Sequence, residues 1–220
     1  GVVRTSYSSG TVIFDAAATG KIPAAAASAC GAPYVGSCRA IFTNTNAAST
    51  TGLTSGASLA VKTLDYTNTT TSPAIGALIA TGITGVTTAQ YQTLIHKVQD
   101  AGLGGVDRST VAVIQSSGIA GNSGRPKMAY FGATDGMLHA VCAQKGGTNG
   151  VTSVICPSAG TELWAFLPRV QLPLLKTNVG RVDGSVRVTD MFGDFTSGTG
   201  NGTKSWKTIL PLVEEAGADG

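Results

Sequence analysis

The Asp135-Gly136 pair is the feature that most constrains the fold, because it lies between two apolar runs of the chain. A tight hairpin turn needs a positive φ, which glycine adopts without strain. The flanking residues alternate or run apolar, as in a half-buried antiparallel sheet. After an insertion, Gly160 opens a third run that ends in an aromatic cluster. We therefore predict a β-meander from Tyr130 to Phe166, with Trp164 largely buried in its packing.

A meander of this kind forms one blade of a β-propeller. From Tyr130 through Leu210, the amino-acid sequence resembles the quinoprotein-like propeller domain of the PilY/PilC family of type IV pilus tip-associated proteins. The resemblance implies a mainly β fold: a partial propeller preceded by an irregular segment with one amphipathic helix. The blade-motif residues are Gly132, Asp135, Gly136, His139, Trp164, Asp183, Gly184 and Trp206.

The composition is typical of an exported, loop-rich β protein. Only 12% of the residues are charged and 30 residues are glycine, a profile less typical of a cytosolic enzyme. The net charge of +3 is spread without a Lys/Arg run, which excludes a nucleic-acid footprint. No apolar stretch approaches the roughly 18 residues of a membrane span. Because a blade takes about 40 to 50 residues and a closed ring about four blades or more, we expect the chain to be part of a larger protein.

The 4 cysteines fall into two local pairs, Cys30 with Cys38 and Cys142 with Cys156. Neither pair has the C-x-x-C spacing or the neighbouring histidines of a zinc site. Disulfides within each pair are the favoured interpretation in an oxidising compartment, although spacing alone also permits crossed connectivities. Cys142 and Cys156 bound an insertion that is rich in Gly and Asn. We expect this insertion to be a recognition loop whose two ends are held together by the disulfide.

The chain divides softly near residue 105. Residues 1–105 form an irregular exported segment with strands and one helix, and residues 106–220 form propeller blades. The helix is predicted over about 88–101: Thr87 and Gln90 make a capping box, and Gly102 supplies a stop. Its apolar residues recur on one face. Strand-like runs occur at 11–15, 39–43, 59–64 and 111–114, and a short helix is possible at 170–176.

Enzymatic candidates are few. Of the 2 histidines, His96 is predicted to be a solvated helix residue and His139 a hydrogen-bonded strand residue. No G-x-S-x-G, H-E-x-x-H or phosphate-loop motif occurs. Quinoprotein dehydrogenases commonly use adjacent cysteines, and no two cysteines here are adjacent. We therefore predict no enzymatic activity and no redox cofactor.

Calcium is the one metal to consider. Asp190, Asp194 and Asn201 offer oxygen ligands across a Gly-rich stretch, but their spacing does not match a calcium-binding loop. Turn-forming residues are the favoured interpretation of all three.

The resemblance implies a function at type IV pili. We expect a non-enzymatic pilus biogenesis factor and tip-associated adhesin, extracellular and located at the pilus tip or the outer membrane. Its expected partners are pilin and minor pilin subunits and a host or abiotic surface. The alternatives are a fragment of a quinoprotein-like oxidoreductase and a generic exported propeller scaffold.

Overall fold

The computed structural model describes residues 2–4, 12–16, 21–22, 39–44, 61–64, 75, 79, 87–117, 124–148, 154–176, 182, 184–195 and 202–211. Strands predominate over helices in this part of the chain, which confirms the predicted mainly β class. The strands are β1 (Val2–Arg4), β2 (Val12–Asp15), β3 (Ile41–Asn44), β4 (Val61–Thr63), β5 (Ala112–Ile114), β6 (Met128–Gly132), β7 (Leu138–Cys142), β8 (Gly146–Thr148), β9 (Val154–Cys156), β10 (Glu162–Phe166), β11 (Thr189–Asp194) and β12 (Lys204–Ile209).

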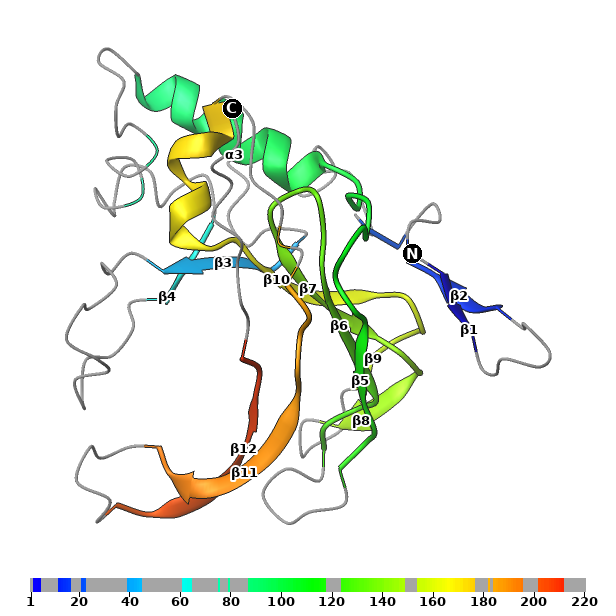
Figure 1. Ribbon diagram of the computed structural model, residues 1–220. Coiled ribbons are helices and arrows are strands. Elements are labelled where there is room, and N and C mark those ends of the chain that lie inside the picture. The colour runs from blue at the N-terminus through cyan, green and yellow to red at the C-terminus, as the bar shows by residue number, and fades with distance from the viewer. Residues whose placement is uncertain are drawn as a thin grey trace.

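The central sheet has six strands in the order β4-β3-β10-β7-β6-β5. Within it, β5, β6, β7 and β10 form a continuous antiparallel meander. At the other edge of this meander β3 pairs with β10 in parallel, so that Ala165 faces Ile41 and Phe166 faces Phe42. Figure 1 shows the sheet in the middle of the molecule, with helix α3 (Thr88–Asp100) above it and the β11–β12 hairpin below.

The turn between β6 and β7 forms where the Asp-Gly pair predicts it. Gly136 has a φ of 80°, a conformation that glycine adopts without strain. The Ala133 amide donates to the Met137 carbonyl at 3.0 Å, and the Gly136 amide donates to the Ala133 carbonyl at 3.2 Å. All residues of β6 and β7 are buried. The predicted hairpin is therefore confirmed, and neither of its strands lies at an edge of the sheet.

Helix α3 also follows its local sequence signals. The Thr87 side chain accepts from the Gln90 amide, and the Gln90 side chain accepts from the Thr87 amide, which completes the predicted capping box. The helix ends at Asp100 with Ala101 as its C-cap. Ile95 is fully buried, and the other apolar residues of the stripe pack around it: Tyr91, Leu94 and Val98.

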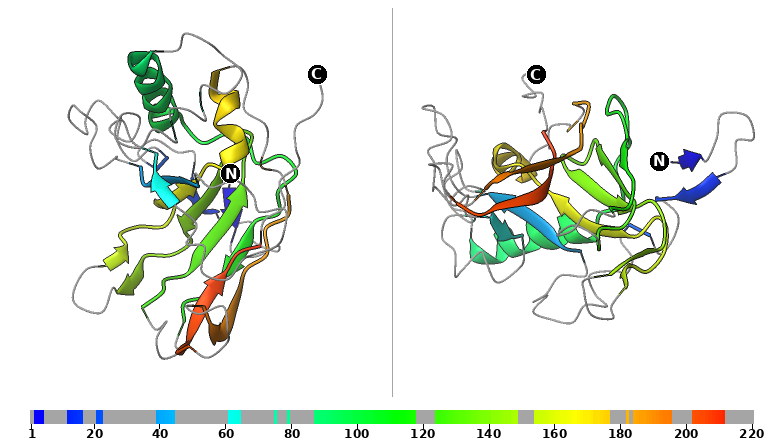
Figure 2. Two further views of the ribbon diagram at one scale, coloured as in Figure 1. Left: turned by 90° about the vertical axis from the view of Figure 1, so that its left-hand side faces the viewer. Right: turned by 90° about the horizontal axis from the view of Figure 1, so that it is seen from below.

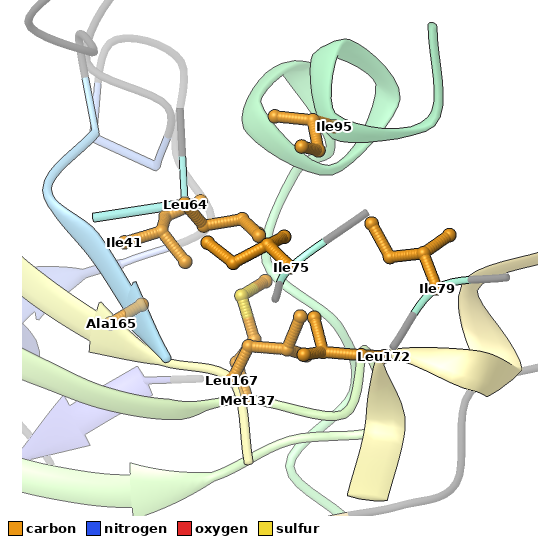
Figure 3. Packing of buried hydrophobic residues seen from close by; sticks show 9 residues of the cluster. All are labelled: Ile41, Leu64, Ile75, Ile79, Ile95, Met137, Ala165, Leu167 and Leu172. Carbon is orange, nitrogen blue, oxygen red and sulfur yellow. The ribbon is translucent and has the colours of Figure 1, made fainter. Parts of the chain in front are cut away.

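Each face of the sheet is covered by a different part of the chain. On one face, α3 and the 3-10 turns η2 (Arg169–Gln171) and η3 (Pro173–Lys176) close a core beside Ala165 and Met137. Figure 3 shows this cluster, which consists of Ile41, Leu64, Ile75, Ile79, Ile95, Met137, Ala165, Leu167 and Leu172. On the opposite face, Val182 and Val186 pack on the meander. The segment that precedes β11 therefore covers the second face.

Three two-stranded sheets of the described residues lie outside the central sheet. β8 and β9 pair between Gly146 and Cys156, inside the predicted insertion. β11 and β12 pair over their full length as a separate two-stranded ribbon. In both views of Figure 2 this ribbon (orange to red) extends along one side of the sheet. β1 and β2 form a further two-stranded sheet.

Several sequence expectations need adjustment. Within the described residues the sheets close into neither a barrel nor a propeller, and the six-stranded mixed sheet exceeds one antiparallel blade because β3 and β4 extend it. Trp164 packs against the buried cluster on the meander, and the part of it that stays exposed borders an open pocket. The insertion, which we expected to be a recognition loop, carries the β8–β9 hairpin. The division of the chain near residue 105 remains a prediction.

Candidate functional site

A buried histidine in β7 lies between two carboxylates. The His139 Nδ1 atom is 2.7 Å from Glu162 Oε1, and its Nε2 atom is 3.1 Å from Asp135 Oδ2. Asp135 reaches the ring from the hairpin turn, and Glu162 reaches it from the neighbouring strand β10. Both partners are acceptors when ionised, so each nitrogen satisfies its contact by carrying a proton. The geometry therefore indicates an imidazolium between two carboxylates.

Arg39 extends this network to helix α3. Its guanidinium donates to both Glu162 oxygens, at 2.7 and 2.9 Å. It also donates to the carbonyls of Val98 and Ala101, at 3.2 and 3.0 Å. These are carbonyls at the C-terminal end of α3, where the helix dipole favours a cation. The Arg39 side chain thus links the segment before β3 to the end of α3 and to β10.

The surroundings shift the pKa values of the three acid–base groups toward their charged forms. Burial alone would raise the pKa of Glu162, but hydrogen bonds from His139 and Arg39 outweigh it and lower that pKa to about 2. Burial likewise opposes ionisation of Asp135, and its contacts with His139 and backbone amides lower its pKa. Burial would lower the pKa of His139, yet the two carboxylates raise it. With His139 and Arg39, both carboxylates form a charge-balanced buried network.

The His139 ring at the centre of this network is closed off from solvent. His139 is fully buried, with 0% of its surface exposed, and the Arg39 side chain is 1% exposed. A general base must reach the proton that it abstracts. His139 is therefore a hydrogen-bonded strand residue, as the sequence predicted, and the arrangement holds elements together rather than exposing a reactive group.

The Cys142–Cys156 disulfide is present and joins β7 to β9, with a Cα–Cα distance of 5.7 Å. Both cysteines are fully buried and belong to the apolar cluster on the meander, where the Cys156 Sγ atom lies 3.8 Å from Met128 Sδ. The bond thus roots the β8–β9 hairpin directly in the core. Cys30 and Cys38 lie outside the described residues.

Close backbone contact fixes the hairpin against the start of β6. Gly147 has a φ of 75°, and a Cβ atom at this position would lie 2.8 Å from both the Gly124 carbonyl oxygen and Pro126 side-chain atoms. Glycine is therefore required here for two reasons, space and conformation. The hairpin cannot swing away from Pro126 without losing this contact.

A pocket with a volume of about 390 Å³ opens where this hairpin meets the apolar face of the meander. Tyr130 and Trp164 form an aromatic corner in it, with ring centroids 5.9 Å apart. The lining consists of Gly124, Arg125, Pro126, Met128, Tyr130, Ile155, Leu163 and Trp164. Concave sites with apolar walls and a few polar groups are typical binding sites in proteins. The predicted recognition insertion thus borders a pocket through Ile155 of β9.

Arg125 connects the pocket to the β11–β12 ribbon. It forms an ion pair with Asp190, and it donates to Thr208 Oγ1 at 2.8 Å and to the Gln115 carbonyl at 2.7 Å. Burial raises the pKa of Tyr130, with Arg125 opposing this shift and Asp190 adding to it. The ion pair leaves this wall of the pocket polar but balanced in charge.

The calcium candidates do not meet at one point in the described part of the chain. Asp190 is engaged by Arg125, whereas Asp194 accepts from the Gly202 amide at the far end of the ribbon. Asn201 lies outside the described residues. Among the residues that the structure describes, no three His, Cys, Asp or Glu side chains group as metal ligands.

The remaining blade-motif residues mark close contacts. A Cβ on Gly132 would lie 1.8 Å from the Val182 carbonyl oxygen, so this glycine lets the covering segment approach the sheet. The Gly184 carbonyl accepts from Ser109 Oγ, which itself accepts from the Gly132 amide at 2.9 Å. Trp206 packs on Phe192 across the ribbon. Asp183 lies outside the described residues.

Sequence reasoning missed Arg39, Glu162 and Arg125, and it assigned Asp135 only to the turn. His96 is half-buried and lies 3.0 Å from Asp100, so its expected solvated position is only partly met. One signal was present in the sequence: Glu162 is a lone acidic residue in an apolar strand, and a charge there requires a buried partner. The position of that partner in the chain is not a local property.

Two further observations bear on function. In the part of the chain that the structure describes, no helix is both long enough and apolar enough to span a membrane. Comparison with family models, with curated proteins and with solved structures finds no match to this chain.

Proposed function

We propose that this chain is a non-enzymatic component of type IV pili, exported to the cell exterior, that supports pilus assembly and contacts surfaces. The meander β5–β6–β7–β10 would be one propeller blade, and β11–β12 would be the first strands of the next. The observation that carries this proposal is the β6–β7–β10 meander, which has a disulfide-rooted hairpin between its second and third strands. Its strands and its turn bear the blade-motif residues Gly132, Asp135, Gly136, His139 and Trp164.

The proposed mechanism assigns separate tasks to the sheet and the hairpin. A packed sheet is a rigid platform, and binding residues occur preferentially on loops that such a scaffold positions. His139 and its partners fix the platform from within. The β8–β9 hairpin and its pocket would face a host or abiotic surface, whereas pilin and minor pilin subunits would contact another face. Calcium stays a possible additional ligand through Asp190 or Asp194.

Genetic complementation tests this function. In the bacterium that encodes the chain, deletion of the gene should lower both surface piliation and attachment. Complementation with a variant whose insertion between Cys142 and Cys156 is shortened should restore piliation but not attachment, because the platform is intact. The matched control is Val170→Ala, which alters an exposed residue away from the pocket.

Two results would contradict the proposal. Normal piliation and attachment in the deletion strain would remove the pilus function. A quinone recovered in stoichiometric amount from the denatured protein would instead favour the oxidoreductase alternative.

A further inference from the structure

We propose that the pocket between the disulfide-rooted hairpin and the sheet binds a neutral sugar ring, as part of a longer carbohydrate chain. This assignment rests on the proposed attachment function for its biological meaning, and it names the ligand class of that same surface. It is carried by the aromatic corner, by the balanced ion pair beside it and by a second aromatic pair on the adjoining ribbon.

Trp164 provides the platform, and the buried Tyr130 ring supports it from the core. The Tyr130 and Trp164 rings meet at 42° with centroids 5.9 Å apart, and Trp164 retains an exposed part. A pyranose ring has an apolar face of C–H groups that packs on an indole, while its hydroxyls project from the rim. Met128, Leu163 and Ile155 complete the apolar lining. The volume of about 390 Å³ falls in the size range of small-ligand sites.

The polar wall favours a neutral ligand with hydroxyl groups. Arg125 is 11% exposed and its charge is balanced by Asp190, so a phosphate or carboxylate would have to compete with a carboxylate already in place. Thr208 adds a hydroxyl that contacts both partners of the pair. The Arg125 Nε donor is buried without a partner in the described structure, so this guanidinium has unused hydrogen-bonding capacity. Hydroxyls both donate and accept, and they suit such a mixed wall.

The ribbon indicates that the ligand is longer than one ring. Side chains two residues apart on a strand share a face, so Phe192 lies on the same face of β11 as Asp190. Trp206 is its cross-strand partner, with ring centroids 5.4 Å apart, and Phe192 is 56% exposed. An extended chain of sugar rings that starts in the pocket would meet this second aromatic pair as it leaves along the ribbon.

Tryptophan fluorescence tests the assignment, because the chain has only 2 tryptophans. In Trp206→Phe, Trp164 is the sole reporter. Titration of this purified protein with neutral hexose and N-acetylhexosamine oligomers should give a saturable change in emission for at least one of them. Longer oligomers should bind more tightly than the monosaccharide. In Phe192→Ala this gain in affinity with oligomer length should be smaller.

Substitutions in the pocket locate the binding. Trp164→Leu should weaken affinity about tenfold, as expected for loss of an aromatic anchor, whereas Trp164→Tyr should retain most of it. Arg125→Lys keeps the charge but loses the fork of donors, and it should weaken binding as well. Calorimetry measures ligand binding by Trp164→Leu and Arg125→Lys. Val170→Ala is the control, and the thermal unfolding of each variant confirms that it is folded.

Three outcomes would overturn the assignment. These are the absence of saturable binding to any oligomer, binding that Trp164→Leu and Arg125→Lys leave unchanged, and binding of aromatic peptides in place of glycans. If glycans bind but the deletion strain attaches normally, the pocket assignment stands and the pilus function fails. If attachment is lost in that strain but no glycan binds, the reverse holds.

Discussion

The β6–β7 hairpin and the β11–β12 ribbon are both regular antiparallel pairs, yet their surroundings differ completely. Every residue of β6 and β7 is buried, whereas no residue of β11 or β12 is. Both pairs form continuous ladders of main-chain partners. A two-stranded pair without further packing is at best marginally stable in water. The comparison teaches that side-chain burial, rather than strand pairing, distinguishes the platform from the part attached to it.

Each region also contains one arginine–carboxylate pair, and these pairs make the comparison quantitative. In the platform, the Arg39 and Glu162 side chains are 1% and 5% exposed. At the ribbon, the Arg125 and Asp190 side chains are 11% and 17% exposed. Less water reaches the first pair, so the loss of one partner there leaves a more poorly solvated charge.

The largest effect is expected from Glu162→Ala, which leaves Arg39 and His139 buried without their shared carboxylate. We expect the free energy of unfolding to fall by about 3 to 5 kcal/mol, as for other broken buried pairs. Asp190→Ala at the ribbon is the matched control and should lower it by only about 1.5 kcal/mol. Urea denaturation measures both. Equal losses would mean that the two regions are stabilised in the same way.

A pair of phenylalanine substitutions compares apolar burial directly. Phe131→Ala in β6 removes a side chain that is 2% exposed, and it should lower the free energy of unfolding by about 3 to 4 kcal/mol. Phe192→Ala in β11 removes one that is 56% exposed, and it should lower it by less than about 1 kcal/mol. A large loss for Phe192→Ala would show that the ribbon packs on something in solution. The same urea experiment gives both values.

Removal of the Cys142–Cys156 bond tests how firmly the hairpin belongs to the platform. The double substitution to serine should lower the free energy of unfolding by about 3 kcal/mol, the value expected for a loop of this length. Proteolysis within the insertion should also become faster. Unchanged stability with unchanged proteolysis would show that strand pairing and the Gly147 contact hold the hairpin by themselves.

The platform network also makes stability depend on pH. The pKa of Glu162 is lowered from 4.5 to about 2, so its contribution is full above about pH 4.5 and is lost as the pH falls toward 2. The pKa of His139 is raised above 6.5, so its contribution is full below pH 6.5 and is lost as the pH rises through the folded pKa. Stability should therefore be greatest between these limits.

The variant His139→Gln separates the two limbs of this profile. It should flatten the alkaline limb, because no imidazolium remains to lose its proton. The acid limb should persist, since Arg39 still holds Glu162 ionised. Thermal unfolding recorded from pH 3 to pH 9 measures both limbs, and an unchanged alkaline limb would assign it to another group.

The elements that local sequence specifies were predicted well. The Asp135-Gly136 turn, the capping box at Thr87 and the neighbouring cysteines Cys142 and Cys156 each depend on residues close in the chain. The site was predicted poorly, because its residues meet only through tertiary structure. Arg39 begins a strand-like run, but nothing in that run indicates a buried partner for its charge, and Arg39 contacts Glu162 only when β3 lies beside β10.

The difference between local and tertiary information also applies to the strand order at the edge of the sheet. The pattern around Ile41 indicates a strand, but it does not indicate which strand pairs with it. Its parallel pairing with β10 depends on the unpaired main-chain groups that the antiparallel meander presents along the outer edge of β10. For the ribbon, alternation along β11 is weak because neither of its faces is buried, so no periodic pattern was required of the sequence.

The parallel pairing of β3 with β10 also sets the order in which the chain can assemble. Ile41 and its partner Ala165 are far apart in sequence, and closing so long a loop has an entropic cost before any contact compensates it. The hairpins and α3 involve only near neighbours, and such elements form on the microsecond scale. We therefore expect the docking of β3 on β10 to be a late, slow step of folding. Before β3 docks, the Arg39 guanidinium is exposed to water. We therefore expect the buried Arg39–Glu162 ion pair to form only at this late step.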